Sequence, residues 1–324
     1  MTAKTAAVTT GEPGESGESG EPAAAGRGHR GQLSEGARAE RRLGWLLCAP
    51  AVAVMIVVAA FPICYAVYLS LQRYDLRFPA ESHFIGLSNY GDVLSSSYWW
   101  HALAVTLIIT VISVAAEFVL GMLLALLMFR TIFLRATMRT IALIPYGIVT
   151  VAAAYGWQYA WTPDTGYLSA LFGDSAPLTR TGTAIAVIIL AEVWKTTPFM
   201  ALLLMAGLSL VPEDLTKAAR MDGASAWQRF TRVTLPLMKP AILVALLFRT
   251  LDAFRIFDNI YILTAGGNGT YSVSILGYDN LFRALNLGIG SAISILIFVC
   301  VAIIALMYIK VFGAAAPGTW STGE

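Results

Sequence analysis

The stretch PEDLTKAARMDGASAWQRFTRVTLP, from Pro212 to Pro236, decides the fold because it is a polar and basic interruption between two long apolar segments. It predicts two short helices around a turn. Pro212 suits the first position of one helix, and Gly223 is a natural stop for it. Ser225 and Gln228 have the spacing of a capping box for a second helix, which Pro236 closes. This docking element, residues 212–236, is shaped to bind a partner.

The composition of the whole chain indicates a membrane protein. Of its 324 residues, 57% are hydrophobic and only 13% are charged, whereas about a quarter of the residues are charged in a soluble domain. We therefore expect an all-α integral membrane protein. A membrane-spanning helix needs about 20 apolar residues. Six runs are long enough, and they lie at residues 45–71, 102–129, 139–161, 184–210, 237–263 and 289–312.

The ends of the chain read differently from its middle. Residues 1–36 are rich in Gly, Glu, Ser and Pro and have little to bury, so we expect a disordered and dispensable tail, or else a regulatory one. Residues 37–312 form the predicted six-helix domain, and residues 313–324 form a short second tail. Lys and Arg gather before the first run, between the second and third, and in the docking element. The positive-inside rule therefore predicts that both termini and the docking element are cytoplasmic.

The predicted fourth span carries a polar cluster, EVWKTTP, from Glu192 to Pro198. Polar side chains at membrane depth are expensive, so they usually face a cavity or a partner. Glu192 and Lys195 are three residues apart and can pair along the helix. Trp194 and Thr196 lie beside them.

The predicted fifth span contains FRTLDAFRIFDNIYILTAGG, in which Arg249, Asp252, Arg255 and Asp258 follow one another at steps of three. On one continuous helix such steps make the charges spiral, and adjacent members can still neutralise one another. Two interpretations remain open. The charges, with Asn259, either line a solute pathway or form a structural network at the contact with another subunit.

The docking element carries a resemblance to a known family. Ala218-Ala219, Gly223 and Val233-Thr234-Leu235-Pro236 stand at the spacing of the EAA loop of permease subunits in binding-protein-dependent ABC importers. One residue departs from that pattern, because Lys217 stands where the family usually has Glu. Any salt bridge that the Glu makes to a partner is therefore in doubt here.

Other segments resemble the sugar-importing members of that family. These are FIGLSNYGDVL at residues 84–94, YGWQYAWTPDTGYLSALFG at residues 155–173, and the fifth-span string with its LTAGG end. The whole chain is similar to trehalose-importer permeases of mycobacteria. The resemblance implies a type I permease bundle in a bacterial cell membrane. It also implies a disaccharide cargo, with trehalose first and maltose or glycerol 3-phosphate as alternatives.

The resemblance also implies partners and residue roles. The partners are a second permease, two ATPase subunits, membrane lipid and an extracytoplasmic sugar-binding lipoprotein, with no nucleic acid. Residues expected to couple to the ATPase are Glu213, Lys217, Ala218, Ala219, Asp222, Gly223, Trp227, Phe230, Leu235 and Pro236. Residues expected on the substrate pathway are Trp157, Glu192, Trp194, Lys195, Thr196, Asp252, Arg255, Asp258 and Asn259. For Trp157, placement in an interfacial aromatic belt is an equal alternative.

The chain carries no signature of an enzyme. It has no Gly-x-x-x-x-Gly-Lys-Ser/Thr phosphate loop, no nucleophile paired with a base, and no cysteines at metal-ligand spacing. We expect neither catalytic nor metal-binding residues, with ATP and Mg held by the partner subunits. An ion-driven secondary transporter and a membrane-embedded regulator remain as alternatives.

Overall fold

The computed structural model describes residues 35–130, 135–172 and 176–313. The chain divides into two compact units, residues 1–58 and residues 59–324. In the first, α1 (Glu35–Met55) leads into a π-helical turn, η1 (Ile56–Ala60), which extends into the second unit. The predicted tails at 1–36 and 313–324 lie almost wholly outside the described residues.

The described part of the second unit is almost entirely helical, with one two-stranded antiparallel ribbon. Its elements are α2 (Phe61–Ser70), β1 (Gln72–Arg73), η2 (Pro79–Glu81), β2 (His83–Phe84), α3 (Ser88–Ser95), α4 (Ser97–Arg130), α5 (Arg135–Gly147), α6 (Thr150–Ala160), α7 (Tyr167–Phe172), η3 (Pro177–Thr179), α8 (Thr181–Ser209), α9 (Glu213–Met221), α10 (Ala226–Arg229), η4 (Phe230–Thr234), α11 (Leu235–Leu237), α12 (Lys239–Phe254), α13 (Asp258–Leu263), α14 (Val273–Tyr278), η5 (Asp279–Arg283) and α15 (Leu287–Gly313).

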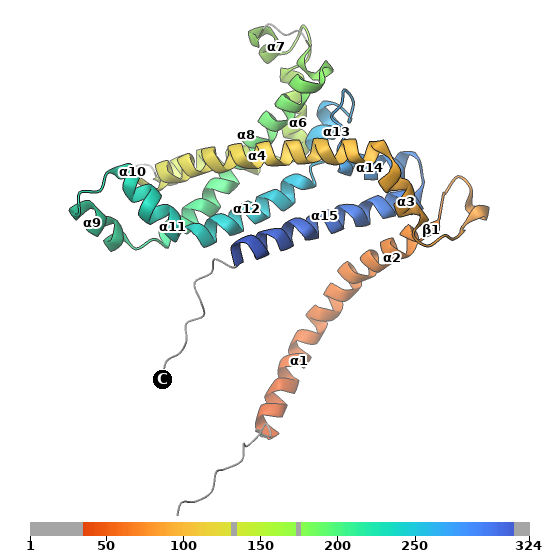
Figure 1. Ribbon diagram of the computed structural model, residues 1–324, viewed down its shortest axis with the longest axis horizontal. Helices are drawn as coiled ribbons and strands as arrows, with labels where there is room; N and C mark the ends of the chain where they lie inside the picture. Colours follow the sequence, from red (N-terminus) through yellow and green to blue (C-terminus); the bar gives the residue numbers. More distant parts are fainter. Residues whose placement is uncertain (1–34, 131–134, 173–175, 314–324) are drawn as a thin grey trace, which may run out of the picture. The chain divides into compact units, whose positions relative to one another are not determined.

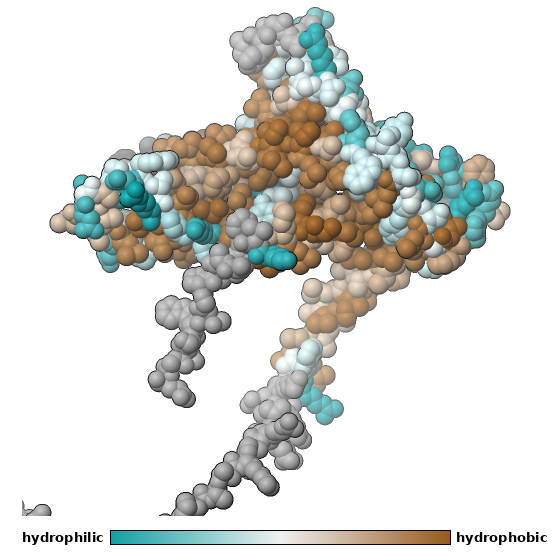
Figure 2. All heavy atoms as spheres, in the orientation of Figure 1, coloured by the Kyte–Doolittle hydropathy of each residue, from teal (hydrophilic) through white to brown (hydrophobic). Residues whose placement is uncertain are grey.

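Helix α4 is the axis of this unit and packs along α8 and α12, while α12 also contacts α15 (Figure 1). Close approach of α4 to α8 requires Gly121, since a Cβ there would lie 2.8 Å from Met200 Cγ. Figure 2 shows that apolar residues cover the long helices, whereas hydrophilic residues gather at the end that carries α9 and α10. A surface of this kind suits helices surrounded by lipid or by other apolar helices.

Four helical segments among the described residues are long and apolar enough to cross a membrane, at Arg42–Ser70, Ser97–Phe129, Thr181–Ser209 and Leu287–Lys310. A fifth arises if Arg139–Gly147 and Thr150–Ala160, which meet at 88°, count as one broken span. The helical, multi-span character is thereby confirmed. The six spans and the cytoplasmic termini stay predictions.

The predicted fifth span at residues 237–263 is not one helix. Helix α12 ends at Phe254, Arg255 caps it, and α13 begins at Asp258. The expectation that four charges spiral along a continuous helix is therefore wrong: Arg249 and Asp252 lie on α12, and Asp258 starts a new helix. Such a break is tolerated at membrane depth where the freed backbone lies against protein or a polar cavity.

Candidate functional site

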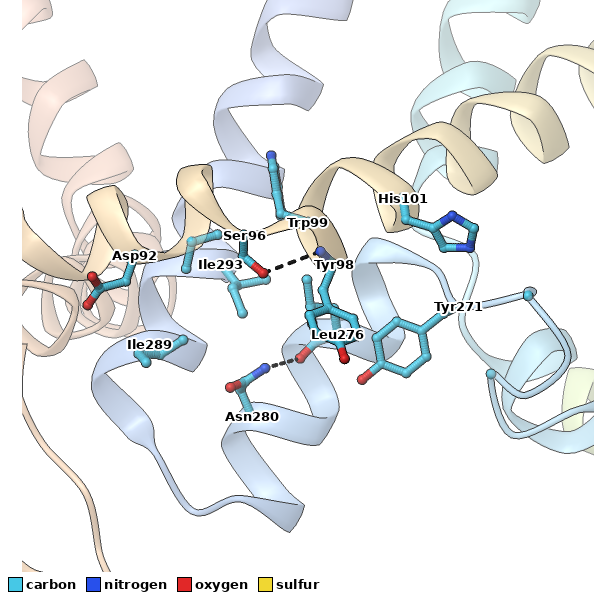
Figure 3. Close-up of a pocket in the computed structure, with 13 residues that line it drawn as sticks. Asp92, Ser96, Tyr98, Trp99, His101, Tyr271, Leu276, Asn280, Ile289 and Ile293 are labelled. Carbon is cyan, nitrogen blue, oxygen red and sulfur yellow. Dashed lines mark hydrogen bonds between the residues drawn. The ribbon is translucent and has the colours of Figure 1, made fainter.

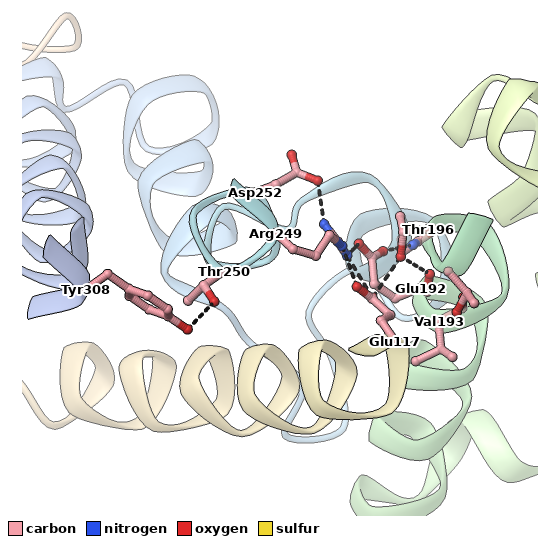
Figure 4. Close-up of polar contacts among 10 residues, drawn as sticks. Glu117, Glu192, Val193, Thr196, Arg249, Thr250, Asp252 and Tyr308 are labelled. Atoms are coloured by element: carbon pink, nitrogen blue, oxygen red, sulfur yellow. Dashed lines mark hydrogen bonds and ion pairs between the residues drawn. The ribbon is translucent and has the colours of Figure 1, made fainter. Parts of the chain in front are cut away.

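The centre of the candidate site is the guanidinium of Arg249, which is completely buried. It donates two hydrogen bonds to the carboxylate of Glu117 and one, of 2.8 Å, to Glu192 Oε1. Its remaining nitrogen donates to Asp252, one turn along the same helix (Figure 4). The forked guanidinium is suited to holding several carboxylates at once. The predicted pairing of Arg249 with Asp252 is confirmed.

The other carboxylate contacts extend this network to four helices. Thr196 donates a 2.7 Å hydrogen bond to Glu117 Oε1, and the amide of Asn259 donates to Glu192 Oε2. The network thereby joins α4, α8, α12 and α13. Buried charges are tolerated only when they are paired and hydrogen-bonded. This cluster of Glu117, Thr196, Glu192, Arg249 and Asn259 therefore fixes the helices around the break.

Lys195 does not pair with Glu192. Its ammonium group donates to the backbone oxygen of Ile148 at 2.8 Å and lies 3.5 Å from that of Tyr146, with the Tyr146 ring 5.9 Å away. These oxygens lie where α5 bends into α6. Carbonyls at the end of a helix lack partners and attract cations. Glu192 is already paired with Arg249, and Lys195 instead binds the backbone oxygens at the bend.

A polar cavity of about 590 Å³ opens beside the network. Among the predicted pathway residues, Glu192, Lys195, Thr196, Asp252, Arg255, Asp258 and Asn259 all line it. The helix break places three of them, because Arg255, Asp258 and Asn259 follow the end of α12. Asp252 keeps 68% of its side chain exposed despite its ion pair. The cavity thus offers both donors and acceptors of hydrogen bonds to a hydroxyl-rich solute.

The two predicted tryptophans line a neighbouring cavity of about 380 Å³. Ile148 lines both this cavity and the polar one, and so lies between them. The rings of Trp157 and Trp194 meet edge to face, with their centroids 5.9 Å apart. Adjacent residues Trp194 and Lys195 therefore point into different spaces. The structure does not bring the tryptophans to the carboxylates.

A third cavity, of about 650 Å³, contains none of the predicted site residues. It lies between the start of α4 and the segments α14 and α15 (Figure 3). Trp99, Ile289 and Ile293 contribute its apolar wall, and Asp92 and His101 also line it.

The docking element has the predicted local structure at its turn. Gly223 has φ = +80°, a conformation that favours glycine, and it ends α9. Ser225 and Gln228 form the capping box, through hydrogen bonds of 3.2 and 2.8 Å between side chain and backbone. Pro212 differs from the prediction. It occupies the N-cap position, and Glu213 is the first residue of α9.

Pro236 does not close the docking element, because helical structure continues through it into α12. Proline inside an α-helix clashes with the carbonyl four residues earlier. Here the preceding turn, η4, is π-helical, and the wider π-helical turn accommodates the ring.

Most of the docking element is exposed, but two of its residues pack against the core. Of the predicted coupling residues, Glu213, Lys217, Ala218, Asp222, Gly223, Trp227 and Pro236 are exposed, whereas Ala219, Phe230 and Leu235 are half-buried. Phe230 and Leu235 pack against the cluster between α4, α8 and α12. Movement of the exposed surface would therefore be passed to these helices.

Lys217 makes its contacts within α9. Its ammonium lies 3.2 Å from Glu213 and 3.5 Å from Asp214, and the hydrogen bond to Glu213 raises the pKa of Lys217. All three side chains are exposed, so these pairs are weak. Lys217 can therefore leave these pairs at little cost.

Sequence reasoning missed Glu117, although a signal was present. It is the only ionisable residue within the apolar run at residues 102–129. A lone charge at membrane depth predicts a buried partner, but no charged residue stands near it in the sequence to identify that partner. Among the residues that the structure describes, no group of three or more His, Cys, Asp or Glu could hold a metal ion.

Comparisons with known proteins cover nearly all of the described chain. Residues 46–313 match the family described as "Binding-protein-dependent transport system inner membrane component". The chain is 64% identical, over 287 residues, to the trehalose transport system permease protein SugA of Mycobacterium tuberculosis, covering 88% of this chain and 94% of that one. It is 42% identical, over 280 residues, to the trehalose/maltose transport system permease protein MalF of Thermococcus litoralis, covering 84% and 94%.

The fold is similar to that of a solved transporter. A chain of the bacterial alginate ABC transporter, crystallised in complex with alginate pentasaccharide-bound periplasmic protein, superposes with a TM-score of 0.75 at 21% identity. The match covers 89% of this chain and 100% of that one.

Proposed function

The chain belongs to the family of binding-protein-dependent transport system inner membrane components, and from this premise we propose that it forms half of the membrane pathway for an imported disaccharide. It is a multi-pass membrane protein and a sugar ABC importer permease. The observation that carries the pathway is the polar cavity of about 590 Å³ at the break between α12 and α13.

The cavity supports this role through its exposed charges. Asp252 and Arg255 are exposed and line the cavity, and the proposed fifth span, residues 237–263, would place them at the depth of the lipid. An exposed charge facing lipid is costly, so this face needs a second subunit over it. The partner permease supplies that cover, and the solute passes between the two subunits.

The docking element supports the coupling to ATP hydrolysis. We place residues 212–236 at the cytoplasmic surface, against one of two ATPase subunits that carry ATP and Mg. Closure of the ATPase pair on ATP moves the element, and Phe230 and Leu235 pass the movement to the core. The pathway then opens to the outside, where a sugar-binding protein unloads. Differential binding to the two states drives the change.

Trehalose is the first candidate for the cargo, on the strength of 64% identity to the mycobacterial trehalose permease. Maltose comes next, because the archaeal relative is named for both sugars. Glycerol 3-phosphate is a third candidate, for which Arg255 and Lys195 would supply positive charge.

The test is uptake of labelled solutes by cells that lack this chain, with and without the chain restored. Trehalose uptake should be lost and then rescued. An Asp252→Asn chain should restore less uptake, while a control change at an exposed site outside the cavity, Glu81→Gln, should restore it fully. If restoring the chain rescues uptake of maltose or glycerol 3-phosphate alone, that solute is the cargo in place of trehalose. If it rescues uptake of no solute, the proposal is refuted.

A further inference from the structure

A chain of aromatic rings leads away from the polar cavity. Phe257 lines the cavity at the break before α13. Its ring centroid lies 5.2 Å from that of Tyr261 and 5.1 Å from that of Tyr278, and Tyr278 lies 5.0 Å from Phe282. Tyr261 and Tyr278 also meet, at 5.3 Å. The rings therefore form a continuous surface from the cavity outwards.

The far end of this surface is open. The side chain of Phe282 is 65% exposed, whereas Phe257, Tyr261 and Tyr278 are half-buried. Exposed rings are common on this chain, but Phe282 differs in being the end member of a series of rings in contact that begins at a residue lining the polar cavity. A solute in that cavity could pass from ring to ring as far as Phe282.

Polar groups accompany the rings. The guanidinium of Arg283 lies 5.8 Å from the Tyr261 ring centroid and 6.0 Å from that of Tyr278, and its Nη1 is 3.2 Å from Asp279 Oδ1. The Tyr271 hydroxyl donates a 2.6 Å hydrogen bond to Asp279 Oδ2. A cation over two of the rings, a carboxylate that pairs with it and a hydroxyl group thus accompany the aromatic series.

The backbone places these groups by a local irregularity. Residues Asp279–Arg283 form the π-helical turn η5, in which the amide of Ala284 donates to the oxygen of Asp279. Single π-helical turns are rare and are frequent at functional sites. The turn carries Phe282 and Arg283 at the end of α14.

We propose that Phe257, Tyr261, Tyr278 and Phe282, with Arg283 beside Tyr261 and Tyr278, form a stacking surface along which the carbohydrate moves between its external delivery point and the polar cavity. This inference rests on the proposed function. A pyranose ring has an apolar face that packs on aromatic rings and an edge of hydroxyls that needs polar partners. The surface offers both, at successive steps of about 5 Å. A series of similar rings lets the solute slide rather than remain bound at one of them.

A contact with the binding protein is the competing explanation for exposed Phe282. The two explanations differ in what they do to ATP hydrolysis. Loss of a docking contact weakens the stimulation of ATP hydrolysis by the loaded binding protein. Loss of a sugar contact leaves stimulation intact but lowers the number of sugars imported for each ATP hydrolysed.

The experiment uses the full complex of both permeases, ATPase subunits and binding protein in liposomes, with labelled trehalose. Phe282→Leu removes the ring and keeps the bulk, Phe282→Tyr keeps the ring, and Phe84→Leu is the control at an exposed phenylalanine on β2. We expect Phe282→Leu to lower the sugar imported per ATP by about two- to tenfold, which matches the loss of one aromatic contact. Phe282→Tyr and Phe84→Leu should retain the wild-type ratio.

An unchanged ratio in Phe282→Leu overturns the inference alone. If import and stimulated ATP hydrolysis both stay at the wild-type level, Phe282 has no part in transport; if both fall in parallel, Phe282 belongs to the contact with the binding protein. If the wild-type complex imports no sugar, the proposed function fails first and the stacking surface fails with it.

Discussion

Replacing Glu117 by Gln tests whether the buried network holds the helices together. The substitution keeps the shape of the side chain and removes its charge, so the guanidinium of Arg249 loses the carboxylate that it contacts twice. Both side chains are fully buried. Breaking a buried ion pair typically costs about 3–5 kcal/mol, because the remaining charge stays buried without its partner.

The lower end of that range applies here. Arg249 retains Glu192 and Asp252 after the substitution, and the amide oxygen of the substituted side chain can still accept one hydrogen bond. A loss of about 3 kcal/mol lowers the unfolding midpoint of a domain of this size by roughly 6–12 °C.

The assay is thermal unfolding of the purified permease complex in detergent, followed by the temperature at which half of it aggregates. Glu81→Gln is the matched control, because Glu81 pairs with Arg73 at 3.3 Å while the two side chains are 59% and 61% exposed. Exposed pairs of this kind contribute about 0–1 kcal/mol. Equal midpoints for the two variants would refute the reasoning. Partial recovery in a triple variant, Glu117→Leu with Glu192→Leu and Arg249→Leu, would support it, because these substitutions remove the three buried charges together.

Three further predictions concern other parts of the chain. Gly223→Ala should reduce ATP hydrolysis stimulated by the loaded binding protein, because φ = +80° costs a non-glycine residue about 1–2 kcal/mol although no atom lies near the new Cβ; full stimulation would exclude a strict need for this turn. Asp252→Ala should slow uptake with assembly preserved, and an unaltered rate would leave Asp252 a purely structural role. The pKa of Asp75 is lowered to about 2, chiefly by the Arg77 side chain. A carboxylate with a lowered pKa stabilises the folded loop above its unfolded pKa of about 3.9, and this stability is lost as the pH falls towards the folded pKa. The Arg77 amide donates to Asp75, so its protection from hydrogen exchange, relative to the intrinsic rate at each pH, should hold down to about pH 4 and fall towards pH 2, and Asp75→Asn should abolish this pH dependence.

The docking element shows which features a sequence predicts well. The capping box of Ser225 and Gln228 and the turn at Gly223 depend on contacts within three residues, so local rules suffice. The failure at Pro236 has a local cause too. A π-helical turn precedes the proline. The sequence contains no pattern that predicts the change from i+4 to i+5 hydrogen bonding.

The division between the cavities was not predictable from the sequence. Trp194 and Lys195 are neighbours in the chain, yet they line different spaces, and Trp157 joins Trp194 from another helix. The separation depends on the 88° bend between α5 and α6, which brings Ile148 between the cavities. No residue pattern around Gly147 and Val149 states the angle, because the angle follows from what the bend packs against.

The break between α12 and α13 and the buried network are best understood as one feature. No glycine or proline occurs from Phe254 to Asp258, so propensity alone gives no reason for a helix to stop there. A continuous α-helix turns by about 100° per residue, so Asn259 would lie on a different side of the helix axis from Arg249. In the structure the break instead brings the Asn259 amide to Glu192, the same carboxylate that Arg249 contacts. With the Arg249 contact, the Asn259 contact gives both oxygens of a buried acid a partner, and the residues of the break line the polar cavity. The distant residue Glu192 therefore ties together the two helices on either side of the break, a contact that local sequence does not reveal.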